Sequence, residues 1–410
     1  MKKALLFFTI VLLVQYHSIS QQNKNVSQWR ATILRKDGNN IVFNFSLQQK
    51  GKQSLLYVEN GAERLRVDSV RFAKDSVFIK MPFFESELKA KVTKDKWNGV
   101  WVKGTADAEQ LQPFAAERSS VRFKLTDGPA KTNVNGRWAL KFSNDTTKEG
   151  ASVAEFWHRG NRVTGSVLTP TGDYRFLEGV VTGNKLKISA FDGSHAVLFT
   201  ADITDKKTLA NGRYYSGLKF TDTWSSVKNA KATVKQDLSA MYLKPGEERL
   251  NFRFNDLEGN PVSINDDRFK NKVVIVQLMG SWCPNCMDET QFLSDYYKKN
   301  KQRGIEIVAL AYEYTTDVER STASLRKFQK RFDVEYPILI TPVTVSDSLR
   351  TEKTLPQVTS IKVFPSSIIL DKKGKVRKFD NSFYGPGTGE HFEAYKRDFY
   401  ETMDNLLKEE

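Results

Sequence analysis

The only two cysteines of this 410-residue chain stand three positions apart, as Cys283 and Cys286. They follow directly after residues 273–280, an apolar run of the kind that forms a buried strand. A C-x-x-C pair at the junction of a buried strand and a helix is a dithiol suited to thiol–disulfide exchange. The pair therefore predicts a strand, a reactive turn and a helix in succession.

The two thiols are expected to play different parts in that exchange. A cysteine in the first turn of a helix lies where free backbone N–H groups and the helix dipole stabilise the thiolate, which is the nucleophilic form. Cys283 is therefore predicted to attack a substrate disulfide. Cys286 lies one helical turn further on, close enough to displace the mixed disulfide and release the reduced substrate.

Two other interpretations of the pair fit the sequence less well. A zinc site would need two further sulfur or imidazole ligands, and the chain has no other cysteine and only four histidines. A purely structural disulfide that closes so short a loop would constrain the unfolded chain little. We therefore expect no metal and no cofactor in the reaction.

Residues 1–20 have the features of a secretory signal peptide. Lys2 and Lys3 form a basic start, residues 4–14 an apolar core, and residues 18–20 supply the cleavage region. An uncleaved anchor is the alternative, but this core is short for a membrane span. No cysteine follows the cleavage point for attachment of a lipid, so we expect a protein exported to the periplasm or cell envelope.

The formal net charge is +15, from 63 Lys and Arg against 48 Asp and Glu. The basic residues are spread along the chain, which is typical of a solvated surface and not of a nucleic-acid partner. The excess charge could favour peripheral contact with anionic envelope lipids or acidic partner surfaces.

Residues 29–234 consist of short runs in which apolar and polar residues alternate, as in antiparallel strands. Pairs suited to hairpin turns punctuate the runs, at Asp37-Gly38, Asn98-Gly99, Asn135-Gly136, Asp192-Gly193 and Asn211-Gly212. We expect an all-β region, a barrel or a sandwich, without catalytic residues. Its aromatic residues are expected in the core, although they could line a ligand cavity; they include Trp29, Trp97, Trp101, Trp138 and Trp157.

Three segments of this region are echoed about 110 residues later, a spacing that suits two successive small β domains or the two halves of a barrel. The echoed pairs are 59–65 with 169–176, 76–79 with 185–188, and 97–101 with 210–215. We therefore divide the region into two β-rich parts, residues 21–128 and 129–235, and consider that one duplicates the other.

A polar linker is predicted at residues 236–248, after which strands and helices alternate through residues 249–410. The expected elements are a hairpin at 251–262, strands at 273–279, 305–310, 366–371 and 375–379, and helices at 283–299, 321–332 and 392–407. This alternation is typical of an α/β domain with a central sheet flanked by helices.

Three segments of this last part carry a family pattern: GSWCPNC at residues 280–286, DLEGNPV at 256–262 and VFPSSIILDKKG at 363–374. With them, residues 245–408 resemble the thioredoxin superfamily, in the TlpA/ResA-like branch of exported thiol:disulfide oxidoreductases, a redoxin group related to AhpC/TSA proteins. The resemblance implies a thioredoxin-like fold here and does not extend to the first 240 residues.

The resemblance also implies roles for residues around the dithiol. Pro365 matches a cis proline that lies beside the active disulfide and leaves the Phe364 backbone free to pair with an extended substrate. Trp282 and Phe364 are candidates for contact with that substrate.

Glu289 matches an acidic residue thought to tune proton transfer. Gln277 stands where thioredoxins carry a buried aspartate; it can hydrogen-bond but cannot relay a proton, so Cys286 must lose its proton to Glu289 or water.

These features together predict an envelope thiol:disulfide oxidoreductase that reduces disulfides of exported proteins. A membrane thiol–disulfide donor would re-reduce the dithiol. The resemblance suggests apo-cytochrome c as one substrate, and hence a part in cytochrome c maturation. The direction of electron flow stays open. One alternative is a peroxiredoxin-type peroxidase, although Gly280 stands where peroxiredoxins carry a threonine. The other is an envelope binding protein whose β region captures a ligand or partner.

Overall fold

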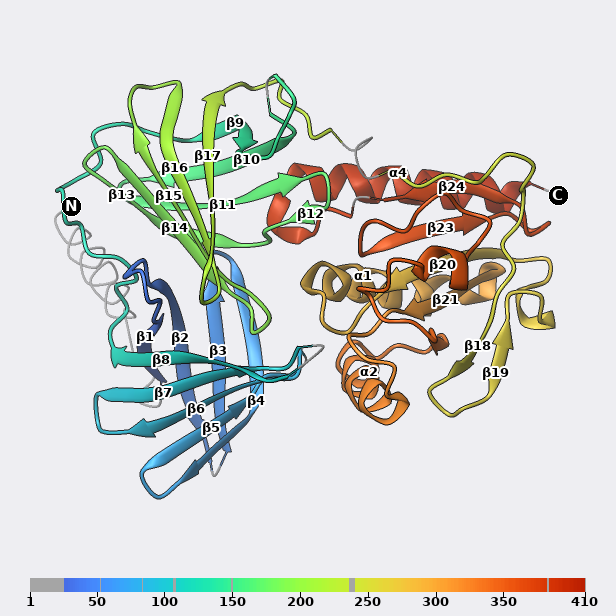
Figure 1. Ribbon diagram of the computed structural model, residues 1–410, viewed down its shortest axis with the longest axis horizontal. Helices are drawn as coiled ribbons and strands as arrows, with labels where there is room; N and C mark the ends of the chain where they lie inside the picture. Colours follow the sequence, from blue (N-terminus) through green and yellow to red (C-terminus); the bar gives the residue numbers. More distant parts are fainter. Residues whose placement is uncertain are drawn as a thin grey trace, which may run out of the picture.

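The computed structural model describes residues 26–51, 53–82, 84–105, 108–148, 150–235, 240–381 and 383–409. The predicted signal peptide lies outside these residues. Two β-barrels lie one above the other, both on the same side of an α/β domain (Figure 1). The predicted fold class, an all-β region followed by a thioredoxin-like α/β domain, is confirmed.

The first β domain is a closed barrel of eight antiparallel strands, in which β1 pairs with both β2 and β8. Alternate residues of β1 are buried inside it, as at Trp29, Ala31 and Ile33, because successive side chains of a strand point to opposite faces. The strands are β1 (Val26–Ile33), β2 (Ile41–Lys50), β3 (Gln53–Asn60), β4 (Glu63–Ala73), β5 (Ser76–Lys80), β6 (Ser86–Val92), β7 (Lys96–Lys103) and β8 (Gln110–Arg118).

The second β domain is also a barrel, closed by pairing between β10 and β11, with the two-residue strand β12 added beside β11. Its strands are β9 (Gly136–Phe142), β10 (Ser152–Arg159), β11 (Arg162–Thr169), β12 (Gly172–Asp173), β13 (Leu177–Thr182), β14 (Lys185–Phe191), β15 (Ala196–Ile203), β16 (Thr208–Ser216) and β17 (Phe220–Lys228). The echoed sequence segments occupy equivalent places in the two barrels, since β5 matches β14 and β7 matches β16. The exact boundaries 21–128 and 129–235 stay a prediction.

Three of the predicted hairpin turns are wrong. Asn135-Gly136 lies at the start of β9, at the end of the connection between the two barrels. Asn98-Gly99 lies inside β7, and Asn211-Gly212 lies at a bulge inside β16. A Cβ atom on Gly99 would lie 1.9 Å from the Lys89 carbonyl oxygen, so glycine is needed there for close approach of two strands and not for a turn. Asn211 adopts a positive φ of 52°, which asparagine tolerates at a bulge.

Four of the five tryptophans named above belong to the barrel cores, as expected: Trp29, Trp97, Trp101 and Trp138 are buried. Trp157 is the exception, because its side chain is 47% exposed and lies beside Gly389 of the α/β domain.

The α/β domain has a seven-stranded sheet in the order β19-β18-β22-β21-β20-β23-β24. β20 is central and lies parallel to β21 and antiparallel to β23. The strands are β18 (Arg253–Asp256), β19 (Pro261–Ser263), β20 (Val273–Met279), β21 (Ile305–Ala311), β22 (Ile338–Ile340), β23 (Ser366–Leu370) and β24 (Val376–Asp380).

Four α-helices cover this sheet: α1 (Pro284–Asn300), α2 (Val318–Phe332), α3 (Arg350–Thr354) and α4 (Glu390–Lys408). Odd-numbered residues of β20, such as Ile275, join the core beneath α1, α2 and α4, while even-numbered ones, such as Val276, join the core on the other face. Both faces are therefore covered, which explains why the strand is apolar at every position except Gln277.

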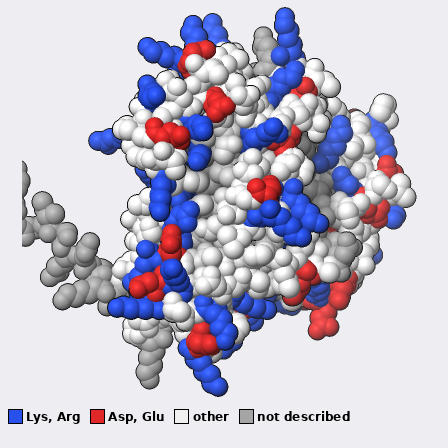
Figure 2. Space-filling view, turned by 60° about the vertical axis from the view of Figure 1, so that its left-hand side comes forward, with Lys and Arg blue, Asp and Glu red and all other residues white. Residues whose placement is uncertain are grey.

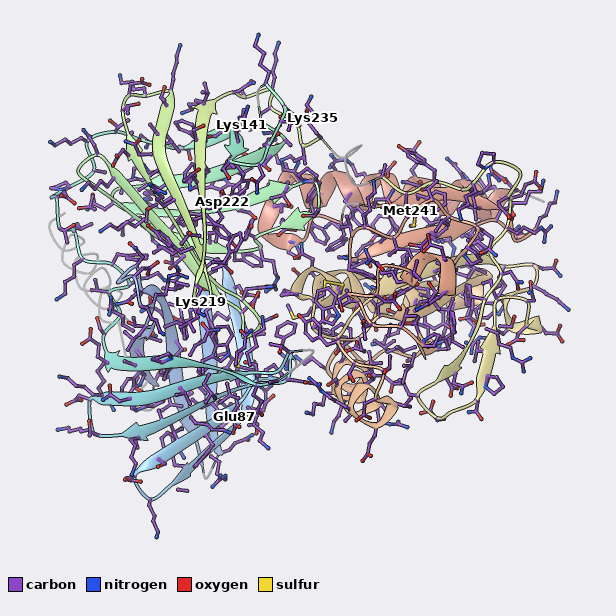
Figure 3. All side chains as sticks on the ribbon, in the orientation of Figure 1. Glu87, Lys141, Lys219, Asp222, Lys235 and Met241 are labelled. Carbon is purple, nitrogen blue, oxygen red and sulfur yellow. A yellow bond between two sulfur atoms is a disulfide. The ribbon has the colours of Figure 1, made fainter. Side chains whose placement is uncertain are left out.

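The end of the predicted linker is part of the α/β domain. Met241 is buried in the core of its second face, and Leu243 forms a β-bridge with Val358 (Figure 3). Residues 240–243 therefore dock on the domain that they precede.

The surface is basic without a single basic block. The side of the molecule that carries the barrels shows Lys and Arg side chains scattered among acidic and uncharged ones (Figure 2). Among the described residues no helix combines the length and the apolar character needed to cross a membrane.

Candidate active site

The dithiol lies where the central strand meets α1, as predicted. Cys283 is the N-cap of α1 rather than a residue of its first turn, and the Cys286 N–H lies 3.1 Å from its Sγ. Cys283 and Cys286 form a disulfide. Cys283 is only 4% exposed and Cys286 is fully buried, so Cys283 is the more accessible of two closely covered sulfur atoms.

The segment before Cys283 is held by the residues that follow β21. The Ser281 N–H and hydroxyl both donate to the Glu313 carboxylate, at 2.8 and 2.7 Å, and the Trp282 indole donates to the Tyr312 carbonyl at 2.8 Å. Burial raises the pKa of Glu313 to about 7, although the two hydrogen bonds from Ser281 act to lower it. Sequence reasoning missed Glu313. The available signal was its place just beyond a strand parallel to β20, at the sheet edge where α/β sites gather.

The predicted substrate-contact residues meet at Cys283. The Phe364–Pro365 bond is cis, as the resemblance implies, and the Phe364 carbonyl oxygen lies 3.6 Å from the Cys283 Sγ. The Phe364 ring packs edge-on against Trp282, with ring centroids 5.9 Å apart, and Trp282 stacks on Tyr314 at 5.2 Å. The structure thus brings Trp282, Phe364 and Pro365 to the Cys283 sulfur.

Glu289 is buried beside the dithiol, with 1% of its surface exposed. Its carboxylate accepts hydrogen bonds from the Gln277 amide at 2.8 Å and from the Ser367 hydroxyl at 3.0 Å. Burial raises its pKa to about 8; the charge of Asp380 adds to this effect and the two hydrogen bonds oppose it. Glu289 lies one helical turn beyond Cys286, so a carboxyl group with a raised pKa and the second sulfur of the pair share the interior of the domain.

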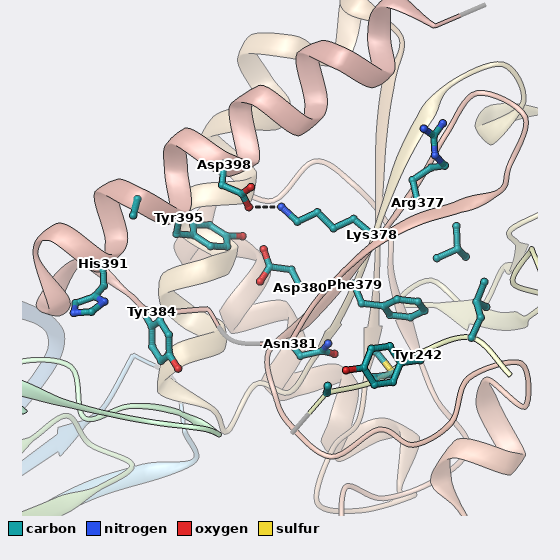
Figure 4. A pocket seen from close by; sticks show the side chains of 15 residues that line it. Tyr242, Arg377, Lys378, Phe379, Asp380, Asn381, Tyr384, His391, Tyr395 and Asp398 are labelled. Carbon is teal, nitrogen blue, oxygen red and sulfur yellow. Dashed lines mark hydrogen bonds and ion pairs between the residues drawn. The ribbon is translucent and has the colours of Figure 1, made fainter. Parts of the chain in front are cut away.

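A groove of about 800 Å³ lies behind Glu289, between β24 and α4 (Figure 4). Asp380 and Tyr395 line it, and Asp380 pairs directly with Ser367 across the sheet. The charged environment of Glu289 therefore extends to Asp380 in this groove.

Both barrels lie against the dithiol. From the second barrel, the Ser194 hydroxyl donates to the Trp282 carbonyl at 3.1 Å, and the Asp173 carboxylate accepts from the Asn285 amide at 3.0 Å. From the first barrel, Glu85 pairs with Arg320 of α2 at 2.7 Å. No short sequence motif marks these contacts, because they join residues more than 80 positions apart.

An ion cluster joins all three domains. Arg175 of the second barrel donates to Asp288 of α1 and to Glu63 of the first barrel, each at 2.7 Å. Asp173, two residues earlier, also accepts the Gly385 N–H at 2.9 Å, and burial raises its pKa to about 6. These contacts hold the barrels over the start of α1.

Comparisons with known proteins assign the carboxyl-terminal domain to a family. A redoxin family model matches residues 244–390. The thiol-disulfide oxidoreductase ResA of Bacillus thuringiensis is 31% identical over 150 residues, which cover 37% of this chain and 75% of that protein. The chain belongs to the redoxin family.

Two more distant relatives are similar over the same part of this redoxin. ResA of Bacillus subtilis is 26% identical over 153 residues, covering 37% of this chain and 73% of that protein. A crystal structure of a putative thiol:disulfide interchange protein DsbE from Chlorobium tepidum is 20% identical, covers 40% of this chain and 99% of that chain, and gives a TM-score of 0.30. The TlpA/ResA-like resemblance is confirmed, and the protein is an oxidoreductase of the thiol–disulfide class.

Proposed function

We propose that this redoxin is an envelope enzyme that reduces disulfides of exported proteins through Cys283 and Cys286. The observation that carries the proposal is the position of the Cys283 Sγ, at the start of α1 and 3.6 Å from the carbonyl that precedes Pro365. An extended substrate that pairs with the Phe364 backbone would present its disulfide to this sulfur.

The reaction starts from the reduced dithiol. The Cys283 thiolate, stabilised by the helix N-terminus, attacks one sulfur of the substrate, and the other substrate sulfur leaves and takes up a proton. Cys286 then loses its proton to Glu289 and attacks the Cys283 sulfur. The second substrate thiol departs, and the enzyme is left with the Cys283–Cys286 disulfide. Two electrons have passed to the substrate.

A membrane donor that carries a reactive dithiol would return the enzyme to the reduced state. The predicted signal peptide at residues 1–20 supports a periplasmic or envelope location, and disulfides of exported proteins are the substrates such a location offers. Apo-cytochrome c is one candidate substrate that the ResA resemblance suggests.

Two cysteine variants test the proposal. Cys283→Ser should abolish reduction of a protein disulfide, because the attacking thiolate is lost. Cys286→Ser should accumulate mixed disulfides with its substrates, visible on non-reducing gels and identifiable by mass spectrometry. Turnover by Cys283→Ser at the rate of the unmodified enzyme would refute the mechanism. The reduction potential of the pair, equilibrated against thiol buffers, would show whether the enzyme acts as a reductant or as an oxidant.

A further inference from the structure

Two adjoining cavities lie beside the second barrel, one facing the first barrel and the other facing the start of α1. One of about 490 Å³ lies between β7 and β8 of the first barrel and β15 to β17 of the second. The other, of about 370 Å³, lies at the mouth of the second barrel. They share His195, Ser216 and Phe220 as lining residues, so we treat them as one inter-barrel cleft.

The inner end of the inter-barrel cleft is lined by Pro284 and Asn285, the two residues between the cysteines. Ser194, which donates to the Trp282 carbonyl, lines its outer part. Cys283 is only 4% exposed, so a flat protein surface cannot reach this sulfur in the present arrangement. An extended segment in the cleft would lie against the two residues that separate the cysteines.

Two buried polar atoms of the cleft have no hydrogen-bond partner among the described residues. One is the Oε1 of Gln112, whose side chain is 2% exposed, and the other is the Nη1 of Arg175. Both residues line the cleft. Buried polar groups are normally paired, so a ligand that supplies a donor to Gln112 and an acceptor to Arg175 would satisfy both.

The outer part of the cleft is positively charged. Lys103 and Lys219 line it, and Lys219 lies on the β16–β17 hairpin that reaches toward the first barrel (Figure 3). Within the described ranges, no carboxylate lies within ion-pair distance of Lys103. Burial lowers the pKa of Lys103, and the charge of Asp192 opposes this effect. An incoming carboxylate would meet an ammonium group that is partly removed from water.

The inner part is aromatic. Tyr174 and Phe220 pack edge-on against Tyr214, with centroids 5.4 and 5.9 Å from its ring, and Phe220 is 59% exposed. A cavity of this size in the mouth of a small barrel accommodates one large side chain.

We propose that the inter-barrel cleft binds an extended acidic segment of the disulfide substrate, with a carboxylate at Lys103 and an aromatic side chain packed against Tyr214 and Phe220. The segment thereby delivers its cysteine to Cys283. This inference rests on the proposed function and adds a substrate class to it. The enzyme should select acidic, aromatic peptide disulfides over basic or neutral ones.

Matched peptides with one disulfide test the selectivity. Three peptides of one length carry two Asp, two Asn or two Lys near a Phe that flanks the cysteine, and a fourth carries Ala in place of Phe. Lys103→Gln should raise the KM for the Asp peptide about tenfold, because one charge-assisted hydrogen bond is lost. The kcat for the Asp peptide and the KM for the Asn peptide should change little. Lys103→Arg should retain the preference. Phe220→Ala should abolish the distinction between Phe and Ala.

Lys96→Gln is the matched control, because Lys96 is an exposed lysine of the same strand, β7, and does not line the cleft. Equal effects of Lys103→Gln and Lys96→Gln, or equal effects on all peptides, would overturn the proposal. Calorimetric binding of the Asp peptide to the oxidised enzyme reports on the cleft without turnover, and no binding would also overturn it. Reduction of hydroxyethyl disulfide, a small neutral substrate, separately tests the dithiol chemistry of the proposed function.

Discussion

Glu289 shows how burial changes the chemistry of a single residue. Its pKa is about 8 in the folded protein, against 4.5 for an ordinary glutamate, so the folded state holds a proton that the unfolded state loses as the pH rises above 4.5. Stability should therefore fall between pH 4.5 and 8, by a limit on the order of 5 kcal/mol. Glu289→Gln, which cannot ionise, should escape this loss. Denaturant midpoints of both proteins, measured at pH 5 and pH 9, check this prediction. The same change in midpoint between the two pH values for the unmodified protein and for Glu289→Gln would contradict it.

Asp380 should tune the same carboxyl from the next strand. It lies opposite Ser367, whose hydroxyl donates to Glu289, and its negative charge helps to raise the Glu289 pKa. Asp380→Asn should move the pH dependence of mixed-disulfide resolution by Cys286 to lower pH. Stopped-flow measurement of that step across pH checks the shift. Glu401→Gln, at an exposed position of α4, is the control and should leave the profile in place.

At the scale of elements, the turn between β20 and α1 depends on β21. Glu313, just after β21, accepts both hydrogen bonds from Ser281, and Ser281 is buried. Glu313→Ala leaves a buried backbone N–H unpaired and should cost about 1–3 kcal/mol of stability, with lower kcat/KM because Trp282 and Cys283 lose their support. Glu313→Gln keeps an acceptor for the Ser281 N–H and should recover most of both. Thermal unfolding and turnover measure the pair of variants; equal loss in both would show that the hydrogen bonds do not matter.

At the scale of the whole molecule, the barrels limit access to the dithiol. Arg320 of α2 pairs with Glu85 of the first barrel, and both side chains are about one-third exposed. Arg320→Gln should loosen this contact by up to about 1 kcal/mol, so that reduced Cys283 reacts a few-fold faster with a bulky maleimide while iodoacetamide reacts at an unchanged rate. The matched control is Arg326→Gln, on the same helix, which removes an ion pair to Glu258 within the α/β domain. If both variants react as the unmodified protein does, the first barrel does not restrict access.

The sequence by itself determined the features that depend on neighbours along the chain. The apolar strand, the helix that starts at the dithiol, the cis proline and the alternating strands of the β region follow from local periodicity, turn chemistry and a short family pattern. Even the buried hydrogen bond of Gln277 was accessible from its position in the motif. Local patterns failed at Asn98-Gly99 and Asn211-Gly212, where a turn signal marks close strand contact and a bulge.

Tertiary structure alone decided what lies over the dithiol. The burial of Glu289, the support from Glu313 and the closure of two barrels depend on strand pairings between distant segments. The cluster of Glu63, Arg175 and Asp288 joins residues more than 100 positions apart on three domains. Each of these charges looks like an ordinary surface residue in the sequence, because nothing local records which partner removes it from water. The dithiol was therefore evident from the chain, whereas the cleft that leads to it exists only where the two barrels meet the α/β domain.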